Sequence, residues 1–281
     1  MSEATPHAVS KAGHVPGSSD ASVSVRNVEL EYAVHRLRHP TLKETITGVF
    51  RKSRTQKLTL QALRGIDFVV KAGERVGIIG RNGAGKSSLL RTIAGIYRPT
   101  AGEINTQGFM VPLFQLGLGF HPELTATANI LQAAALLGLD IETMRSRIPG
   151  ILEFAELEEY ADVPIKYLST GMAMRLAFTT ATEIPPDILL LDEVLTGGDG
   201  EFRERASARM EALVDRTSIV LLVSHALPIV RRLSSRVLWI DKGQVRMDGD
   251  PAEVIAAYKA LTGLPPGRLH GSSPLRVQES S

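Results

Sequence analysis

Eight residues in the first third of the chain have the types and spacing of a phosphate-binding loop. The segment Gly80-Arg81-Asn82-Gly83-Ala84-Gly85-Lys86-Ser87 matches the pattern G-x-x-x-x-G-K-[ST], and Ser88 follows it. Its glycines let the backbone wrap closely around oxygen atoms, so that N–H groups and the start of a following helix point at a polyphosphate. We expect Lys86 to reach the β- and γ-phosphates and Ser87 to bind Mg²⁺. The alternative, a glycine-rich turn with a surface lysine, is disfavoured by the apolar run before the loop and the helical sequence after it.

A second set of candidate site residues lies about a hundred residues further along. The apolar run Ile188-Leu189-Leu190-Leu191 ends in the adjacent carboxylates Asp192 and Glu193. A strand that ends in this way places Asp192 to hold Mg²⁺ and Glu193 to orient or deprotonate an attacking water. Two surface acids at a strand end are the alternative, and the phosphate loop upstream favours nucleotide chemistry over it.

A third motif separates the possible nucleotide-binding families. Leu168-Ser169-Thr170-Gly171-Met172 opens a predicted helix about twenty residues before the two carboxylates. It resembles the signature of ATP-binding cassette (ABC) proteins, Leu-Ser-Gly-Gly-Gln, with Thr in the third place and Met in the fifth. The resemblance implies that Ser169 and Gly171 present donors and a positive helix end to the γ-phosphate of ATP held by a second copy. By itself Ser169 indicates only a helix N-cap.

The same resemblance assigns roles to four further residues. Gln115 stands at the place of the family's Q-loop glutamine, which senses Mg²⁺ and water and moves with the membrane partner. Asp199 resembles the D-loop aspartate, and His225, after Ser224, resembles the switch histidine that touches the γ-phosphate. Tyr32 is similar to the aromatic residue that stacks on adenine.

Length and composition limit the class of protein. The 281 residues allow one large domain or one domain with a subdomain, and 43% hydrophobic residues supply a core. A net charge of +2 gives no overall electrostatic case for nucleic acid. Zero cysteines exclude disulfides and cysteine-based metal or nucleophilic sites. No secretory signal or membrane span is visible, and we expect residues 1–22 and 262–281 to be disordered tails.

Short apolar strands alternate with helical segments and predict an α/β fold with a parallel-sheet core. The expected buried strands are 75–79, 188–191 and 219–223, with helices at 86–94 and 201–214 between them. Further expected elements are strands at 23–32, 58–70, 103–104 and 109–111, helices at 126–139, 141–148 and 173–182, a hairpin at 236–247 and a helix at 251–261. The resemblance implies one ABC nucleotide-binding domain at 23–261, with an antiparallel β subdomain and a helical subdomain at about 115–183.

A basic insertion interrupts the predicted domain at residues 35–57. It carries seven Lys or Arg residues against Glu44, and Leu42, Ile46, Val49 and Phe50 have the spacing of a short amphipathic helix. Such a segment can lie on anionic lipid headgroups or meet the pyrophosphate of a lipid-linked substrate. A solvated charged helix or loop is the third alternative.

Three stretches narrow the resemblance to the ATPases of bacterial polysaccharide exporters, which move O-antigen, teichoic acid or capsule. They are residues 116–125, 167–178 and 192–202, and the basic insertion resembles that subfamily as well. The resemblance implies a head-to-tail homodimer that drives two transmembrane permease subunits, with a lipid-linked cell-envelope polysaccharide as substrate. It also implies a peripheral location on the cytoplasmic face of the inner (plasma) membrane.

Three other functions fit part of the pattern. The first is the ATPase of an ABC transporter for another substrate. The second is a soluble cassette ATPase acting on nucleic acid or ribosomes, which the single cassette, the lack of heptads and the 14 scattered aromatic residues disfavour. The third is a P-loop kinase, which would leave residues 168–172 and His225 without a role. Hydrolysis of ATP without an acceptor distinguishes the kinase from the others.

Overall fold

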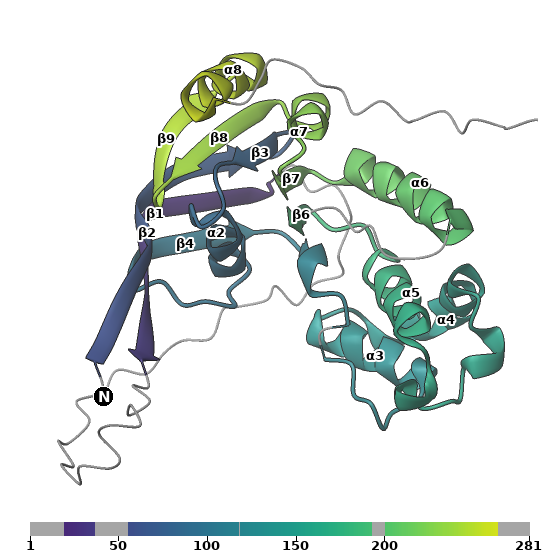
Figure 1. Ribbon diagram of the computed structural model, residues 1–281. Coiled ribbons are helices and arrows are strands. Elements are labelled where there is room, and N and C mark those ends of the chain that lie inside the picture. Colours follow the sequence, from purple (N-terminus) through teal and green to yellow (C-terminus); the bar gives the residue numbers. More distant parts are fainter. Residues whose placement is uncertain (1–19, 37–55, 118, 193–199, 264–281) are drawn as a thin grey trace, which may run out of the picture.

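The computed structural model describes residues 20–36, 56–117, 119–192 and 200–263. Figure 1 shows the sheets on one side of the molecule and α3, α4 and α5 on the other. The strands are β1 Ser22–Arg36, β2 Gln56–Lys71, β3 Arg75–Ile79, β4 Ala101–Gln107, β5 Met110–Pro112, β6 Ile188–Asp192, β7 Ile219–Val223, β8 Arg236–Asp241 and β9 Gln244–Gly249. The helices are α2 Lys86–Ile93, α3 Ala126–Leu136, α4 Ile141–Ala155, α5 Thr170–Ala181, α6 Gly200–Arg216, α7 Leu227–Leu233 and α8 Pro251–Thr262, with 3₁₀ turns η1 Leu113–Gln115, η2 Glu158–Tyr160 and η3 Ile165–Tyr167.

The core is a six-stranded sheet in the order β5-β6-β7-β3-β8-β9, which confirms the expected α/β fold. Its first five strands are parallel, and only β9 pairs antiparallel with its neighbour. The central strands β6 and β7 are buried almost throughout, as their unbroken apolar sequences predict. One row of the register joins Asp192 on β6 to Val223 on β7 and then to Ile78 on β3.

A second sheet is antiparallel, in the order β2-β1-β4. The four apolar residues of β1 that suggested a strand, Val23, Val25, Val28 and Leu30, are all buried. Strict alternation would turn Val28 away from the core, because it lies three residues after Val25. The pairing shifts between these two residues, and Asn27 takes a left-handed conformation with φ 44°, so the bulge returns Val28 to the inner face.

The basic insertion begins and ends on paired strands. β1 and β2 remain in register as far as the pairs His35↔Lys57 and Arg36↔Gln56, so the insertion joins the ends of a long hairpin. Residues 37–55, with the expected amphipathic helix, lie outside the described residues. That helix stays a prediction.

The helical region has an apolar core of its own, built by α3, α4 and α5. α4 continues to Ala155, beyond the end expected before Pro149. Its buried stripe runs through Met144, Ile148, Ile151 and Ala155, and this burial outweighs the lost backbone hydrogen bond at proline. α5 starts at Thr170 rather than Ala173, and α7 was not expected from the sequence.

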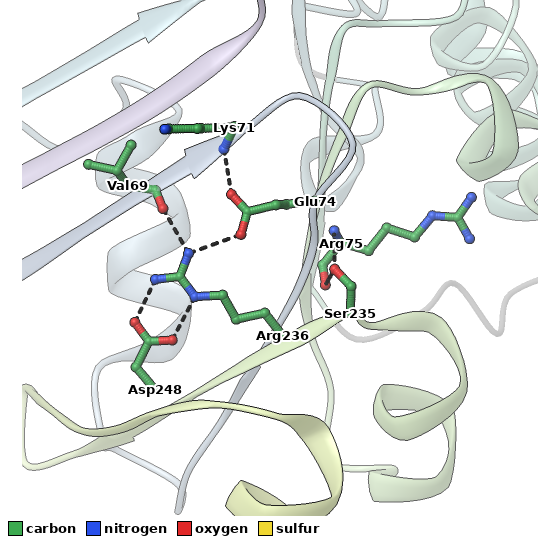
Figure 2. A network of polar contacts seen from close by, with 7 residues as sticks. All are labelled: Val69, Lys71, Glu74, Arg75, Ser235, Arg236 and Asp248. Carbon is green, nitrogen blue, oxygen red and sulfur yellow. Dashed lines mark hydrogen bonds and ion pairs between the residues drawn. The ribbon is translucent and has the colours of Figure 1, made fainter.

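An ion network joins the parallel sheet to the antiparallel sheet and is drawn in Figure 2. Arg236 on β8 donates two hydrogen bonds of 2.6 Å to Asp248 and others to Glu74 Oε1 at 3.0 Å and the Val69 carbonyl at 2.9 Å. Glu74 in turn accepts from the Lys71 backbone N–H at 2.7 Å. Hydrogen bonding to Asp248 raises the pKa of Arg236 above its ordinary value. The charged guanidinium holds β2, β8 and β9 together.

Arg236→Ala is expected to lower the free energy of unfolding by about 2 kcal/mol, because it leaves two half-buried carboxylates without their cation. Urea denaturation followed by circular dichroism measures this loss. Arg26→Ala is the matched control, since Arg26 and Glu103 form a pair that is 69% and 58% exposed. The control should change stability by less than about 0.5 kcal/mol. Equal effects of the two substitutions would contradict the assigned role.

Candidate nucleotide-binding site

The strand order brings four of the predicted site segments to one edge of the parallel sheet. Parallel strands point their carboxyl ends the same way, and ligands of open α/β sheets bind at that edge. β3 leads into Gly80, β6 ends at Asp192, and β7 leads into Ser224 and His225. β5 leads into η1, which ends at Gln115. Residues spread over more than a hundred positions of the sequence therefore share one site.

The phosphate loop is held in a shape that only glycine tolerates at two places. Gly85 has φ 108°, and a Cβ there would come within 2.6 Å of the Ala62 carbonyl oxygen. A Cβ at Gly80, with φ 153°, would collide with the Ile240 carbonyl. At Gly80 and Gly85 the loop therefore lies against β8 and β2 with no room for a side chain. The packing of the loop against β2 and β8 therefore requires these two glycines, whether or not a phosphate is bound.

The start of α2 fits a phosphate group. Gly85 is the N-cap and supplies no side-chain hydrogen bond, and the first turn holds no acidic residue. The first N–H groups of a helix have no partner within it, so they and the helix dipole favour an anion here. Lys86 is 6% exposed and donates to the carbonyls of Gly80 at 2.9 Å and Arg81 at 3.1 Å. Its ammonium therefore lies over its own loop, where a phosphate would compete with these carbonyls.

The residues around α2 fit Mg²⁺ only together with phosphate oxygens. Asp192 and Ser87 are both half-buried, and each offers one hard oxygen. Across the described part of the chain, no group of three or more His, Asp or Glu residues can hold a metal by itself. Mg²⁺ prefers this situation, since it commonly takes one or two protein oxygens and completes its shell with phosphates and water. Glu193 and Asp199 lie outside the described residues, so their roles stay predictions.

Tyr32 lies beside the start of α2. Its hydroxyl donates to Ser88 Oγ at 3.1 Å, and its ring meets Tyr97 edge-on with centroids 5.5 Å apart. The insertion between β1 and β2 therefore does not separate Tyr32 in space from the phosphate loop. Stacking of this ring on adenine stays a prediction.

The turn after β7 presents His225 at the surface. Ser224 is 6% exposed, and its hydroxyl accepts from the Ala226 N–H at 3.1 Å, which shapes the turn. His225 itself is exposed, directly after the buried strand. The sequence order alone predicted this placement, and its contact with a γ-phosphate stays a prediction.

The C-terminal helix reaches the neighbourhood of the phosphate loop. Tyr258 on α8 is 7% exposed and packs edge-on against Trp239, with centroids 5.4 Å apart. Burial raises the pKa of the Tyr258 phenol, and the positive charge of Arg81 in the loop opposes the shift. α8 thus supports the strand on which the loop rests.

Ser169 and Gly171 lie at the exposed start of α5, in the helical region. Ser169 Oγ accepts from the Met172 N–H at 3.2 Å, so within one chain Ser169 is the helix N-cap. A Cβ on Gly171 would meet only Ser169 Oγ, at 3.9 Å, among the described residues. The fold of one chain therefore does not require glycine there, although glycine costs about 1 kcal/mol within a helix. The close approach of another molecule to the start of α5 would explain why glycine occupies position 171.

Asn129 is an organising residue that the sequence analysis missed. It is fully buried on α3, and its Oδ1 accepts from the His121 N–H at 2.6 Å. Its Nδ2 donates to the carbonyls of Leu124 and Thr125, both at 2.9 Å. Asn129 therefore holds residues 121–125, just before α3, in one shape. In the sequence, Asn129 could have been noticed as a single amide side chain on the apolar face of the helix predicted at residues 126–139.

Comparison with known proteins defines the class. The family model described as ABC transporter matches residues 63–196, which include the phosphate loop, the Ser169 motif and Asp192. The solved dimer of the ATP-binding cassette MJ0796 with ADP and Pi has the same fold, with TM-score 0.58 and 23% identity over 82% of this chain and 98% of that one. The chain belongs to the ABC transporter family.

Two similar proteins have names that state what they export. The chain is 38% identical to the O-antigen export system ATP-binding protein RfbE of Yersinia enterocolitica, over 80% of this chain and 96% of that protein. It is 42% identical to the O-antigen export system ATP-binding protein RfbB of Myxococcus xanthus over 82% of this chain. That match spans 52% of the Myxococcus protein, about half of its length. Within the described residues, no helix is both long and apolar enough to cross a membrane.

Proposed function

We propose that this chain is the ATP-hydrolysing subunit of an ABC exporter for a lipid-linked cell-envelope polysaccharide. The observation that carries the proposal is the strand order, which brings Gly80, Asp192, His225 and Gln115 to one sheet edge. Residues 23–261 form the nucleotide-binding domain, with the helical subdomain at about 115–183. The similarity to RfbE over nearly all of that protein supports the choice of substrate class.

In this proposal the chain's own residues bind the phosphates and place the water. Backbone N–H groups of Gly83, Gly85 and Lys86 cradle the phosphates, and the Lys86 ammonium neutralises their charge. Ser87, Asp192 and Gln115 would hold Mg²⁺, which would withdraw charge from the bound phosphates. Asn82, Ala84 and Ser88 complete the lining, and Tyr32 stacks on the adenine.

Hydrolysis then depends on Glu193, which orients the water and accepts its proton as the oxygen approaches the γ-phosphorus in line. His225 donates to the γ-phosphate from the end of β7. The bond from the γ-phosphorus to the β–γ bridging oxygen breaks, and ADP and phosphate leave. The chemistry needs no acceptor other than water, which separates it from a kinase.

Two copies complete each site in this proposal. Ser169 and Gly171 at the start of α5 face solvent in one chain, and in the head-to-tail homodimer they contact the γ-phosphate held by the partner. Asp199 lines the same interface. Closure excludes water and strengthens the contacts around the phosphate.

The membrane steps belong to other subunits. Two transmembrane permease subunits carry the polysaccharide, and this chain binds them from the cytoplasmic face of the inner (plasma) membrane. The helical region, which follows Gln115 in the chain, passes on the closing motion. The proposal includes no role for nucleic acid.

Loss of the chain is expected to trap its polysaccharide inside the host cell. Deleting the gene, or replacing it with the Lys86→Ala variant, should reduce polysaccharide at the cell surface by more than about tenfold, because transport stops with hydrolysis. Antibody or lectin labelling of intact and permeabilised cells measures the two pools. Lys71→Ala, at an exposed lysine in the same sheet assembly, is the matched control and should export normally.

Normal surface polysaccharide in the deletion strain would refute the substrate class. Affinity purification of the tagged chain from detergent-solubilised membranes tests the partner separately. A polytopic membrane protein should be recovered with it. Recovery of ribosomes or nucleic acid instead would favour the soluble-ATPase alternative.

A further inference from the structure

The turn between β8 and β9 is hydrogen-bonded to the phosphate loop through the backbone of Gly243. The Gly243 N–H donates to the Ala84 carbonyl at 2.9 Å, and the Gly243 carbonyl accepts from the Arg64 N–H at 2.8 Å. Gly243 therefore joins the phosphate loop to β2. Gly243 is buried, so its N–H would lose a hydrogen bond if the Ala84 carbonyl turned away.

The space around Gly243 admits no side chain. Its φ is 80°, and a Cβ there would come within 2.6 Å of the Ala62 carbonyl oxygen. The same oxygen would lie 2.6 Å from a Cβ on Gly85, and that Cβ would lie 3.6 Å from the Gly243 Cα. The two glycines therefore pack together against one peptide group of β2. A side chain at position 243 would push the turn away from the loop.

The hydrogen bond from Gly243 sets the direction of the Gly85 N–H. The Ala84 carbonyl and the Gly85 N–H belong to one planar trans peptide group, so they point in opposite directions. Since the carbonyl faces the turn between β8 and β9, the N–H faces away from that turn. On one side of this peptide group the Ala84 side chain packs in the core, and on the other Leu89 donates to the Gly85 carbonyl at 2.8 Å. With both flanking residues held, the remaining freedom is a rotation of the peptide plane.

The phosphate loop does not select the orientation of this plane by itself. Glycine adopts positive and negative φ about equally readily, so Gly85 permits the plane to turn over. In the turned-over form the Ala84 carbonyl, in place of the Gly85 N–H, would face an incoming phosphate and repel it. The bond from Gly243 excludes that form before ATP arrives, and a site that is already ordered avoids the cost of ordering during binding.

We propose that Gly243 is a positioning residue for ATP binding, because its N–H holds the peptide group that aims the Gly85 N–H at the phosphates. The inference rests on the proposed function, in which the Gly85 N–H is one of the groups that cradle the phosphates. Gly243 acts through Ala84 and Gly85 and needs no contact with ATP.

An ester in place of the peptide bond between Lys242 and Gly243 tests the proposal, because it removes the N–H and adds no side chain. The chain has no cysteine, so residues 1–225 can be expressed as a thioester and joined to synthetic residues 226–281 through a temporary Ala226→Cys substitution. Desulfurisation then restores the alanine. Circular dichroism establishes that the joined chain is folded.

The matched control is an ester in place of the peptide bond between Ser234 and Ser235, made in the same way. It removes the Ser235 N–H, which donates to the Arg75 carbonyl at 2.7 Å. Arg75 is the first residue of β3, at the end of the strand opposite to the phosphate loop. Each ester therefore removes one backbone hydrogen bond, but only the ester at Gly243 removes a bond to the loop.

The ester at Gly243 should raise the Kd for ATP by at least about tenfold, because the Gly85 N–H no longer has a fixed direction toward the phosphates. The control ester should change the Kd by less than about twofold. Displacement of a fluorescent ATP analogue measures both constants.

The Gly85 amide resonance supplies a readout that a purely stabilising role would not move. It can be observed by labelling the expressed residues 1–225 with ¹⁵N. Saturation with ADP should shift this resonance strongly in the unmodified chain and in the control ester, because the N–H then donates to an anion. In the ester at Gly243 the shift should be much smaller.

Gly243→Ala tests the same contact without synthesis. Its Cβ would meet the Ala62 carbonyl and displace the donor to Ala84, so the Kd for ATP should again rise by at least about tenfold. Gly73→Ala is the matched control, since Gly73 has φ 88° and an added Cβ would meet nothing within 4 Å among the described residues. It carries the same backbone strain and should change the Kd by less than about twofold.

Either an unchanged Kd or an unchanged Gly85 shift in the folded ester at Gly243 overturns the proposal. An equal loss of ATP affinity in the control ester also overturns it, because the loss of any backbone bond would then be enough. Failure of the proposed function is seen in chains without an ester. If the unmodified chain bound no ATP, or if Lys86→Ala bound it normally, the phosphate loop would not be the ATP site and both proposals would be refuted.

Discussion

Glu193→Gln is expected to reduce the ATP turnover of the purified chain by at least about 100-fold while leaving ATP binding intact. The amide cannot accept a proton from the attacking water, and general-base contributions of about 10²- to 10⁴-fold are typical. Binding should be preserved because, in the proposed site, Lys86, Ser87 and Asp192 would still hold the phosphates and Mg²⁺. Release of inorganic phosphate measures the turnover, and a filter assay measures bound ATP.

The same variant should accumulate as an ATP-bound dimer, because in the proposed function hydrolysis is the step that would reopen the closed pair. Analytical ultracentrifugation with and without ATP distinguishes the dimer from the monomer. Glu201→Gln, eight residues further along on α6, is the matched control and should turn over ATP normally. Normal turnover in Glu193→Gln would remove Glu193 from the mechanism, and a strictly monomeric ATP-bound form would remove the dimer.

Ser169→Arg is expected to reduce turnover by about 100-fold as well, for a different reason. The new side chain would block the start of α5 from a partner's γ-phosphate, where transition-state charge has to be stabilised. ATP binding to the isolated chain should stay normal, because Ser169 lies in the helical region and the phosphate loop precedes α2. Tyr167→Arg places the same side chain at a residue that is 70% exposed, two positions earlier, and serves as the control.

Mixing two inactive variants tests whether each site is shared between chains. Lys86→Ala removes the proposed phosphate-binding lysine. Ser169→Arg blocks the surface that, in the proposed dimer, contacts the γ-phosphate held by the partner. A head-to-tail heterodimer of the two variants has one site with both defects and one site with neither. If the chains mix at random and the sites act independently, about a quarter of wild-type activity should return. No recovery on mixing, with heterodimers present, would place the complete site within one chain.

Motifs whose function depends on local backbone geometry could be predicted from the sequence. The apolar run, the glycine loop and the helix after it predicted a phosphate site, and the start of α2 has the uncapped N-terminus that such a site needs. The N-cap role of Ser169 was equally readable, because capping depends only on neighbouring residues. The end of α4 was predicted too early, because Pro149 and Gly150 suggest a stop and only packing against α3 and α5 makes continuation favourable.

The ion pair of Glu156 with Arg205 and the Arg236 network had no signal in the sequence. Glu156 and Arg205 are 49 residues apart, and Glu74 and Arg236 are 162 apart. Charged residues at such separations are indistinguishable from solvated surface residues until the fold brings them together. The hydrogen bond from Tyr32 to Ser88 also crosses the entire basic insertion, although the resemblance places both residues at one ATP site.

The sequence by itself predicted a phosphate-binding loop, because phosphate binding needs consecutive backbone N–H groups and a lysine at a set spacing, which are local properties. The resemblance of residues 168–172 to the ABC signature then indicated the family. It also determined the parallel core, since only strands buried on both faces are apolar throughout. Tertiary structure alone decided which strand ends share the site and which helices are joined by ion pairs. Strand order and ion pairs between residues far apart in the sequence depend on how the whole chain packs. The spacing of residues along the sequence does not reveal this packing.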